Sequence, residues 1–248
     1  NLYSSVIEQL RFYTGEVYQL KMPDDDAELN ILLIGDYDYE YPREREIRDG
    51  LELNGATVYE VHFRDEPIFI GPRKVFLLPY YYLLLSVRIA RLSLSVDVDA
   101  VFLTKFNPTM VPVVWFWARL LDAVFVYDLF VSLYRTASLR DINQVLVKAI
   151  FIIERVTLSL PDYHLTETGQ FADLYADIYG LDRNRIIPLP VGVDERWFSP
   201  RQGSATDEFT VLYWGNFLPH HGLDHIVGAA TNLENEKIQF VFLGDGPE

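Results

Sequence analysis

The histidines near the C-terminal end are the first residues whose spacing could do chemistry. His220, His221 and His225 are three of the five histidines in the chain. His221 and His225 are four residues apart, so on a helix they would share one face and could bind zinc. A zinc site needs a third ligand, and the chain has no cysteine and no H-E-x-x-H sequence at this point. We therefore expect no metal ion here.

The same stretch also has the order of a phosphate-binding turn. The apolar run 209–215 ends in Gly215, a short loop follows, and Gly222 begins a predicted helix. Free N–H groups at the start of that helix, and the positive end of its dipole, would favour an anion. His221 could become protonated beside a phosphate and pair with it. The stretch is therefore a candidate phosphate site.

A second glycine-rich turn follows the next predicted strand. It reads LGDGP, residues 243–247, and Gly244 and Gly246 could let a ligand approach the backbone closely. Two such turns after neighbouring strands favour a site for a nucleoside diphosphate. The alternative is that both are ordinary strand-to-helix turns.

Polar residues also follow the first predicted strand of the N-terminal part. Gly35 ends this strand and Asp36 follows it, and Asp36 with Asp38 forms the D-x-D pattern that some metal-dependent transferases use to hold a divalent cation. A single D-x-D pattern in so acidic a chain is weak evidence for a metal. We favour a loop that lines a cleft.

Two later strands end in residues that could contact a hydroxyl substrate. Asp128 ends the strand 122–128, where its carboxylate could accept a hydroxyl proton or bind a sugar, and capping of a turn is the alternative. Thr166 ends the strand 162–166. N-capping of the next helix by Thr166 or Thr168 is the simpler role for these hydroxyls.

These residues are placed on a regular alternation of predicted strands and helices. The first helix begins at Pro42 and ends at Gly55. Such alternation indicates right-handed crossovers and a parallel sheet covered on both faces, an α/β fold. The other helices are expected at 75–95, 109–121, 138–160 and 168–180, and the strands at 29–35, 56–63, 99–105, 122–128, 162–166 and 185–190.

The order of elements predicts two domains. Residues 1–28 form a polar lead-in, 29–195 form a Rossmann-like domain, and 196–208 form a linker rich in Gly, Pro, Ser and charge. Residues 209–248 begin a second α/β unit with a strand at 209–215, a helix at 222–234 and a strand at 238–244. Two strands and one helix cannot form a stable core, so we expect the chain to be an incomplete fragment of a longer protein.

The composition excludes several classes of protein. Without cysteine there are no disulfides and no thiol catalysis, and a formal charge of −15 disfavours binding to nucleic acid. The chain has 5 Lys against 16 Arg and 20 Asp against 16 Glu, which suggests a halophilic protein of a salt-rich cytoplasm, the alternative being an ordinary acidic protein.

Two apolar runs raise the question of membrane contact. The runs 75–87 and 106–118 each have 13 residues, whereas a spanning helix needs about 20. Both are followed at once by an arginine. They could be helices that pack on the sheet, which we favour for most of their length, or helices that dock on a bilayer as a peripheral contact.

In four segments the chain resembles the retaining nucleotide-sugar glycosyltransferases of the GT-B fold, glycosyltransferase family 4. The resemblance spans roughly residues 29–248 and rests on the order of the segments. It implies two Rossmann-like domains with parallel sheets, the second truncated here, that bind a nucleotide sugar between them and transfer the sugar to a hydroxyl without a metal cofactor. The segments are ERVTLSLPDYHLTET, RIIPLPVGVDERWFSP, VLYWGNFLPHHGLDHIVGAA and FVFLGDGPE.

The resemblance also implies roles for single residues. The basic pair that holds the donor diphosphate in this family corresponds to Asn216 and His221, so this chain departs from the family at both positions. The two family glutamates that hold the ribose would lie beyond Glu248. Tyr127 and Asp128 correspond to a His-Asp pair near the acceptor, and the tyrosine puts the acceptor role in doubt.

Together these expectations define the site. The donor-binding set is Gly215, Asn216, His221, Gly222, Gly244 and Gly246, and the acceptor-binding set is Gly35, Asp36, Tyr127, Asp128 and Thr166, with Asp128 as the candidate catalytic residue.

The expected partners are a nucleotide sugar and a sugar or lipid-linked acceptor, in glycan or glycolipid synthesis. The expected location is the cytoplasm, with the inner face of the cell membrane as the alternative. We expect little transferase activity from this chain alone. The alternatives are a truncated, non-catalytic partner subunit and a GT-B-like epimerase of nucleotide sugars.

Overall fold

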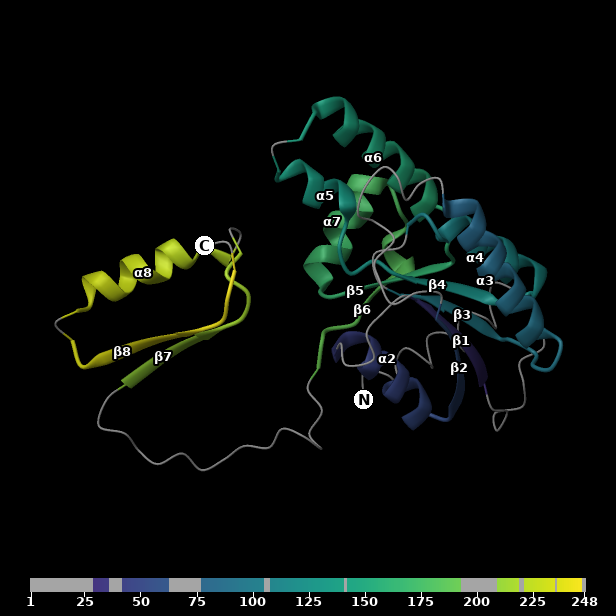
Figure 1. Cartoon of the computed structure of the whole chain (residues 1–248), viewed down its shortest axis with the longest axis horizontal. Coiled ribbons are helices and arrows are strands. Elements are labelled where there is room, and N and C mark those ends of the chain that lie inside the picture. The colour runs from purple at the N-terminus through teal and green to yellow at the C-terminus, as the bar shows by residue number, and fades with distance from the viewer. Residues whose placement is uncertain are drawn as a thin grey trace. The chain divides into compact units, whose positions relative to one another are not determined.

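The computed structural model divides the chain into two compact units, Asn1–Asp194 and Glu195–Glu248, which are described separately below (Figure 1). The predicted domain boundary at 195–196 is next to this division. The predicted lead-in 1–28 and the linker 196–208 lie outside the described residues. The structure describes residues 29–35, 42–62, 77–104, 108–140, 142–192, 209–218, 221–234 and 236–246.

A six-stranded parallel sheet with the order β2-β1-β3-β4-β5-β6 forms the centre of the first unit. The α/β class with a parallel sheet, predicted from the alternation of elements, is confirmed. The order reverses between β1 and β3, and in such sheets a crevice opens beyond the carboxyl ends of the strands at that point. The strands are β1 (Leu29–Gly35), β2 (Ala56–His62), β3 (Ala100–Leu103), β4 (Val124–Asp128), β5 (Tyr163–Thr166) and β6 (Ile186–Pro188).

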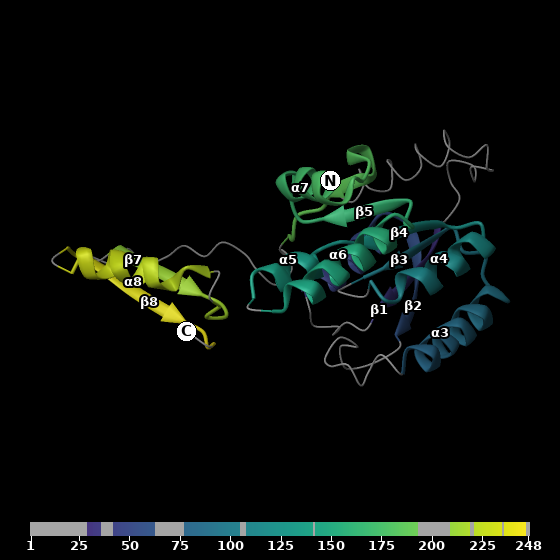
Figure 2. The same ribbon diagram turned by 90° about the horizontal axis from the view of Figure 1, so that it is seen from above.

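Helices cover the sheet unequally on its two faces. On one face, Ile47 and Leu51 of α2 pack with strand residues such as Leu33. On the other face, α3, α4 and α7 pack with residues such as Leu32, and α3, α4 and α6 follow one another along the same side (Figures 1 and 2). The helices are α2 (Pro42–Leu53), α3 (Leu78–Ser93), α4 (Val111–Leu120), α5 (Leu133–Ser138), α6 (Gln144–Leu158) and α7 (Gly169–Tyr179), with a 3-10 turn at Arg183–Arg185.

Helix ends follow from local chemistry. Gly55 has φ of 85° and Gly180 has φ of 70°, and both end a helix in the left-handed conformation that glycine adopts without a steric cost. The Thr168 hydroxyl accepts a hydrogen bond from the Phe171 amide at 3.2 Å and caps α7. The predicted end of the first helix at Gly55 and the capping role of Thr168 are therefore confirmed.

The helix predicted at 138–160 is confirmed by α6, which begins later, at Gln144, and the short helix α5 before it was not predicted. Ser132 caps the short helix α5, with its hydroxyl accepting from the Arg135 amide at 3.0 Å. Asn143 caps α6, with its side-chain oxygen accepting from the Val145 amide at 2.8 Å. Each cap ends the preceding segment and starts a new helix.

The second unit contains two parallel strands and one helix. They are β7 (Phe209–Trp214), β8 (Ile238–Leu243) and α8 (Leu223–Asn232). Leu223 is the one buried hydrophobic side chain among the described residues of this unit, whereas Trp214 and Leu243 are exposed. The element order predicted for 209–248 is thus confirmed, and the described part of the unit has almost no core of its own.

Candidate functional site

A buried ion pair lies at the carboxyl edge of the large sheet. Arg43, in the first turn of α2, donates to Asp128, the last residue of β4, at 2.6 Å from Nη2 to Oδ1 and 2.9 Å from Nε to Oδ2. A third donor, Nη1, contacts the carbonyl of Leu189 just past β6 at 2.9 Å. One guanidinium thus joins α2 to two strands that are far apart in the sequence.

The surroundings of Arg43 keep it charged. Burial acts against the charged form, but the Asp128 carboxylate outweighs it, so the pKa of Arg43 is raised. The ring of Phe130 lies 4.7 Å from the guanidinium carbon and adds a cation–π contact. Arg43 was not among the predicted site residues, because its partner is 85 positions away.

The ion pair adds a role for Asp128 that the sequence did not indicate. Both carboxylate oxygens accept hydrogen bonds from Arg43, so a substrate hydroxyl would have to share this carboxylate with the guanidinium. The role of Asp128 as a catalytic residue stays a prediction, and its observed role is to hold α2 against the sheet edge.

Tyr127, the other residue of the predicted acceptor pair, points into the core. Its ring is buried, and burial raises the pKa of its hydroxyl well above the ordinary value. The edge of the Tyr127 ring meets His164 of β5 with centroids 6.4 Å apart. Burial lowers the pKa of His164 to about 4. Neither ring is presented to a ligand from outside.

Thr166 lies at the end of β5, at the same edge of the sheet as Asp128. Its hydroxyl is buried and has no hydrogen-bond partner among the described residues. Its backbone carbonyl accepts from the Leu189 amide at 2.6 Å. Because Thr166 is as buried as Tyr127, its role as an acceptor contact stays a prediction. Gly35 ends β1 within the sheet, whereas Asp36 and Asp38 lie outside the described residues.

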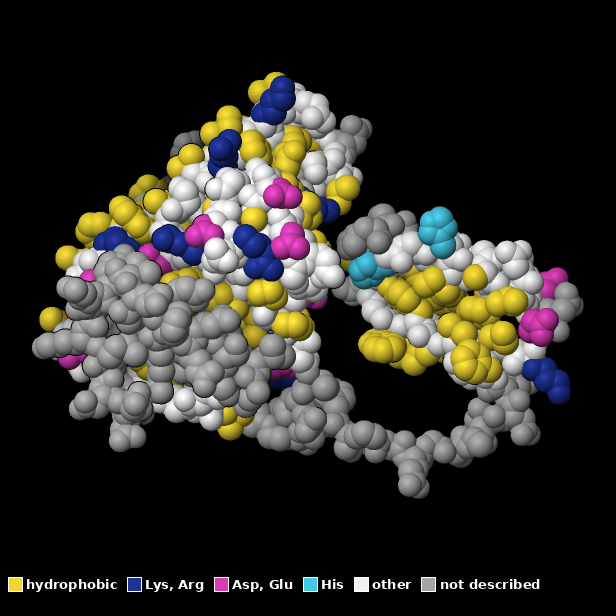
Figure 3. All heavy atoms as spheres, turned by 180° about the vertical axis from the view of Figure 1, so that it is seen from behind, with side chains coloured by type: hydrophobic (Ala, Val, Ile, Leu, Met, Phe, Trp, Pro, Cys, Tyr) yellow, Lys and Arg dark blue, Asp and Glu magenta, His cyan; other side chains and the backbone are white. Residues whose placement is uncertain are grey.

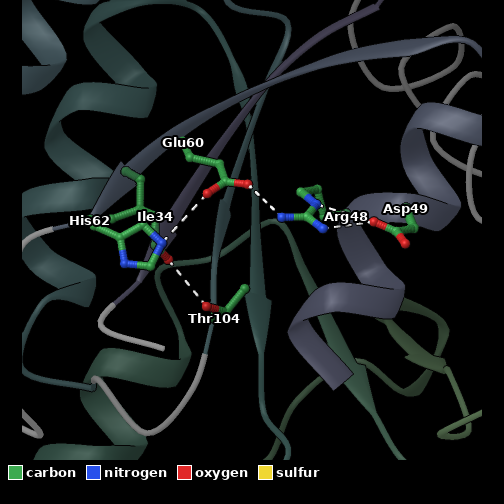
Figure 4. A network of polar contacts seen from close by, with 6 residues as sticks. All are labelled: Ile34, Arg48, Asp49, Glu60, His62 and Thr104. Atoms are coloured by element: carbon green, nitrogen blue, oxygen red, sulfur yellow. Dashed lines mark hydrogen bonds and ion pairs between the residues drawn. The ribbon is translucent and has the colours of Figure 1, made fainter. Parts of the chain in front are cut away.

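Polar groups also surround the carboxyl ends of β1, β2 and β3 (Figure 4). Glu60 of β2 pairs with Arg48 of α2 at 3.3 Å and with His62 at 3.5 Å. The Thr104 amide, just past β3, donates to the Ile34 carbonyl at 2.9 Å. These contacts fix the strand ends beside the point where the strand order reverses.

One contact brings another acidic side chain to this edge. Glu46 of α2 accepts from the Gly192 amide at 2.9 Å, in the segment that follows β6. Glu46, like Arg43, was missed by the sequence analysis. The sequence of α2, PREREIRDGLEL, shows that the helix carries acidic and basic residues, but it does not show which strands these residues face.

In the second unit the two glycine-rich turns pack directly on one another. The Gly215 amide donates to the Leu243 carbonyl at 3.0 Å, and the Phe217 amide donates to the Asp245 carbonyl at 2.9 Å. A Cβ atom on Gly244 would overlap the Gly215 carbonyl. The glycines are therefore required for backbone contact between the turns, a reason that the sequence analysis did not foresee.

His221 is held in place by groups of the first turn. Its Nδ1 lies 2.7 Å from the Tyr213 hydroxyl and 2.7 Å from the Asn216 carbonyl. A carbonyl can only accept, so this contact favours a proton on Nδ1, and a second proton that charges the ring would go to Nε2. Asn216 contributes its backbone oxygen to this arrangement.

The helix α8 begins directly after this turn. Gly222 is its N-cap residue with φ of 66°, and no side chain caps the helix. The His225 amide donates to the Gly222 carbonyl at 3.1 Å, and the N–H groups before it have no side-chain cap. The described residues contain no group of three His, Asp or Glu side chains that could hold a metal ion.

No helix in the described part of the chain combines the length and the hydropathy that crossing a bilayer requires.

Comparisons with known proteins give a distant structural likeness. No family model and no curated protein matches the chain. HepE of Anabaena in complex with UDP is 12% identical with a TM-score of 0.48, and the match covers 88% of this chain and 61% of that one. A second HepE structure, with UDP and glucose, is 13% identical with a TM-score of 0.48, covering 88% and 62%.

A plant protein is similar at a lower level. UGT73P12 of Glycyrrhiza uralensis, complexed with glycyrrhetinic acid 3-O-monoglucuronide, is 10% identical with a TM-score of 0.39, and the match covers 96% of this chain and 66% of that one. The chain spans less than two thirds of the length of the HepE structures. Likenesses at this level do not assign a function to the chain.

Proposed function

We propose that this chain forms part of a glycosyltransferase that moves a sugar from a nucleotide-sugar donor to a hydroxyl acceptor. The observation that carries the proposal is the start of α8 directly after the turn 215–218, where no side chain caps the helix. The Gly215 and Phe217 amides already donate to the facing turn, so the amides at the start of α8 are the ones that suit a diphosphate. The resemblance of this stretch to the donor domain of GT-B glycosyltransferases supports a nucleotide sugar as the ligand.

His221 is the proposed contact to the diphosphate. Its Nδ1 contacts orient the ring at the start of α8, and a bound phosphate would favour its charged form. Asn216 replaces a basic residue of the related family and uses its backbone oxygen to orient His221. Donor binding therefore depends on backbone N–H groups and on one histidine.

The acceptor is proposed to bind at the carboxyl edge of the large sheet. Thr166 supplies a buried hydroxyl without a described partner, and the Arg43–Asp128 pair supplies a rigid polar floor. The sequence resemblance supports several finer assignments, which we propose as well. They are the GT-B arrangement of the two units, membership of family 4, retention of the anomeric configuration, independence of metal and a role in glycan or glycolipid synthesis.

A titration tests the donor site. The chain is titrated with UDP, GDP and ADP by calorimetry, alone and as the variants His221→Ala and His225→Ala. We expect saturable binding of one or more of them and about tenfold weaker binding for His221→Ala, because a charge-assisted hydrogen bond is lost. His225 is exposed on α8 and serves as the matched control. Equal affinity of both variants would remove His221 from the donor site.

A non-catalytic binding subunit is the second candidate. The observation that favours it is the occupation of both Asp128 oxygens by Arg43, which leaves the expected proton acceptor in a buried ion pair. This candidate shares the donor site and differs only in turnover. Both candidates predict nucleotide binding with little turnover by this chain, and release of free nucleoside diphosphate from a sugar donor would exclude the non-catalytic subunit.

A further inference from the structure

The outward faces of three helices form an apolar surface on the first unit. We call it the helix surface and define it by the exposed large hydrophobic residues of α3, α4 and α6. Figure 3 shows such side chains, with Lys and Arg among them, along the upper edge of this unit. The residues are Tyr80, Leu83 and Val87 of α3, Trp115, Phe116 and Leu120 of α4, and Val145, Leu146, Ile152, Ile153 and Val156 of α6.

The three helices form one continuous layer. Helix α4 contacts both α3 and α6. The indole N–H of Trp117 donates to the Ser86 hydroxyl at 3.0 Å and ties α4 to α3. Each helix also has a buried side, represented by Leu85 of α3, Val114 of α4 and Leu158 of α6. Packing on the sheet therefore accounts for one side of each helix and leaves a second apolar side exposed.

The charges on this layer are opposite to those of the whole chain. The chain has a formal charge of −15, yet the single acidic residue of the three helices, Glu154, is buried. Its oxygens accept from the Leu133 and Tyr134 amides and from two hydroxyls. The basic residues of the helices are all exposed, and they are Arg88, Arg91, Arg119, Lys148 and Arg155.

Acidic residues near the layer lie in the loops that lead from the helices back to the strands. The Asp99 carboxylate accepts a hydrogen bond from the Asn30 amide at the start of β1, at 2.8 Å. The Asp162 carboxylate accepts one from the Phe125 amide near the start of β4, also at 2.8 Å. Asp162 also pairs with Arg119. Asp97 and Asp122, in the same loops, are exposed. Among the described residues, the carboxylates next to these helices thus lie in the loops that lead to the strands, and the exposed charges on α3, α4 and α6 themselves are basic.

We propose that the helix surface docks the protein on a bilayer with anionic headgroups. Exposed apolar patches of this extent mark interaction sites, and helices with Trp, Phe and Leu on one side and Lys or Arg beside them bind the bilayer interface. A chain of this net charge is repelled by an anionic surface unless a local patch reverses the sign. The helix surface provides that reversal. The proposal does not depend on sugar transfer.

Vesicle co-sedimentation of the full chain tests the proposal. Vesicles of phosphatidylcholine alone are compared with vesicles containing phosphatidylglycerol, at low and high salt. We expect binding to the anionic vesicles that weakens with salt, because the Lys and Arg contribution is screened. Equal binding to both lipid compositions, or no binding to either, would overturn the proposal.

Matched variants locate the docking surface. The double variant Leu83→Gln/Ile153→Gln changes side chains that are 65% and 57% exposed, and the control Leu53→Gln/Leu243→Gln changes side chains that are 79% and 66% exposed outside the helix surface. We expect about tenfold weaker partition for the first pair and no change for the control. Because all four side chains are exposed, circular dichroism should show both variants folded.

A lysine pair tests the charge contribution in the same way. Lys148→Gln lies on the helix surface, and Lys237→Gln changes an exposed lysine of the second unit. We expect about fivefold weaker binding to anionic vesicles for Lys148→Gln alone. If instead the chain dimerises without lipid, and Leu83→Gln/Ile153→Gln abolishes the dimer while leaving vesicle binding unchanged, the surface is a protein interface and the proposal is wrong.

Discussion

Replacement of Asp128 by Asn should destabilise the first unit more than replacement of the whole ion pair. The side chains of Arg43 and Asp128 are 3% and 2% exposed, so Asp128→Asn leaves a guanidinium charge in a buried place without a counter-charge. Removing one partner of a buried pair costs about 3–5 kcal/mol in the free energy of unfolding. Replacing both partners with apolar residues of similar volume costs far less.

The measurement is a double-mutant cycle by urea denaturation. It compares the chain with Asp128→Asn, Arg43→Met, and Arg43→Met/Asp128→Leu. We expect each single variant to lose about 3 kcal/mol or more and the double variant to recover most of that loss. Arg43 also donates to the Leu189 carbonyl, so recovery should fall short by about 1 kcal/mol for that hydrogen bond. Additive losses in the cycle would refute the view that charge pairing governs this edge.

Three further predictions concern the buried polar groups and the turns. Glu154→Gln should lower the free energy of unfolding, measured by urea denaturation, by about 2–3 kcal/mol. The reason is that the Glu154 carboxylate accepts hydrogen bonds from two amides and two hydroxyls. An unchanged free energy of unfolding would contradict the role of Glu154 as a buried anchor of α5. The pKa of His164 is lowered to about 4, below its value of about 6.5 in the unfolded chain. The contribution of neutral His164 to the free energy of unfolding is therefore complete above pH 6.5 and is lost as the pH falls toward 4. His164→Phe should abolish about 3 kcal/mol of that acid destabilisation. If the free energy of unfolding of the variant and of the unchanged chain fell in parallel with pH, this explanation would be excluded. Gly244→Ala should separate the turns and speed the hydrogen exchange of the Gly215 and Phe217 amides. Gly228→Ala, which has open space around the new Cβ atom, should leave these amides protected. Unchanged protection in Gly244→Ala would contradict the packing of the turns.

The sequence was sufficient for the elements whose ends are set by neighbouring residues. Gly55 and Gly180 end helices because glycine takes positive φ, and Thr168 caps α7 through a hydrogen bond three residues away. Continuous apolar runs such as Leu29–Gly35 predicted buried parallel strands. Each of these signals is local, so the position of the residue in the sequence carries the necessary information.

The rest depended on contacts between distant residues. Helix α5 has a local cap in Ser132, but it is anchored by Glu154, which is 21 residues from Leu133. Arg43 finds Asp128 across 85 residues. Sequence placed Asp128 at a strand end but could not show that a guanidinium occupies both its oxygens. The reason for Gly244, contact with the backbone of Gly215, also depends on two turns that are almost 30 residues apart.

The central claim is that the start of α8, beside the interlocked turns, binds the diphosphate of a nucleotide. Mapping of amide chemical shifts in 15N-labelled chain, during titration with a nucleoside diphosphate, tests it most directly. We predict saturable shifts of amides in 215–218, 221–223 and 244–246, which disappear in Gly244→Ala and persist in Gly228→Ala. Shifts confined to the first unit, or none at millimolar nucleotide, would contradict the claim.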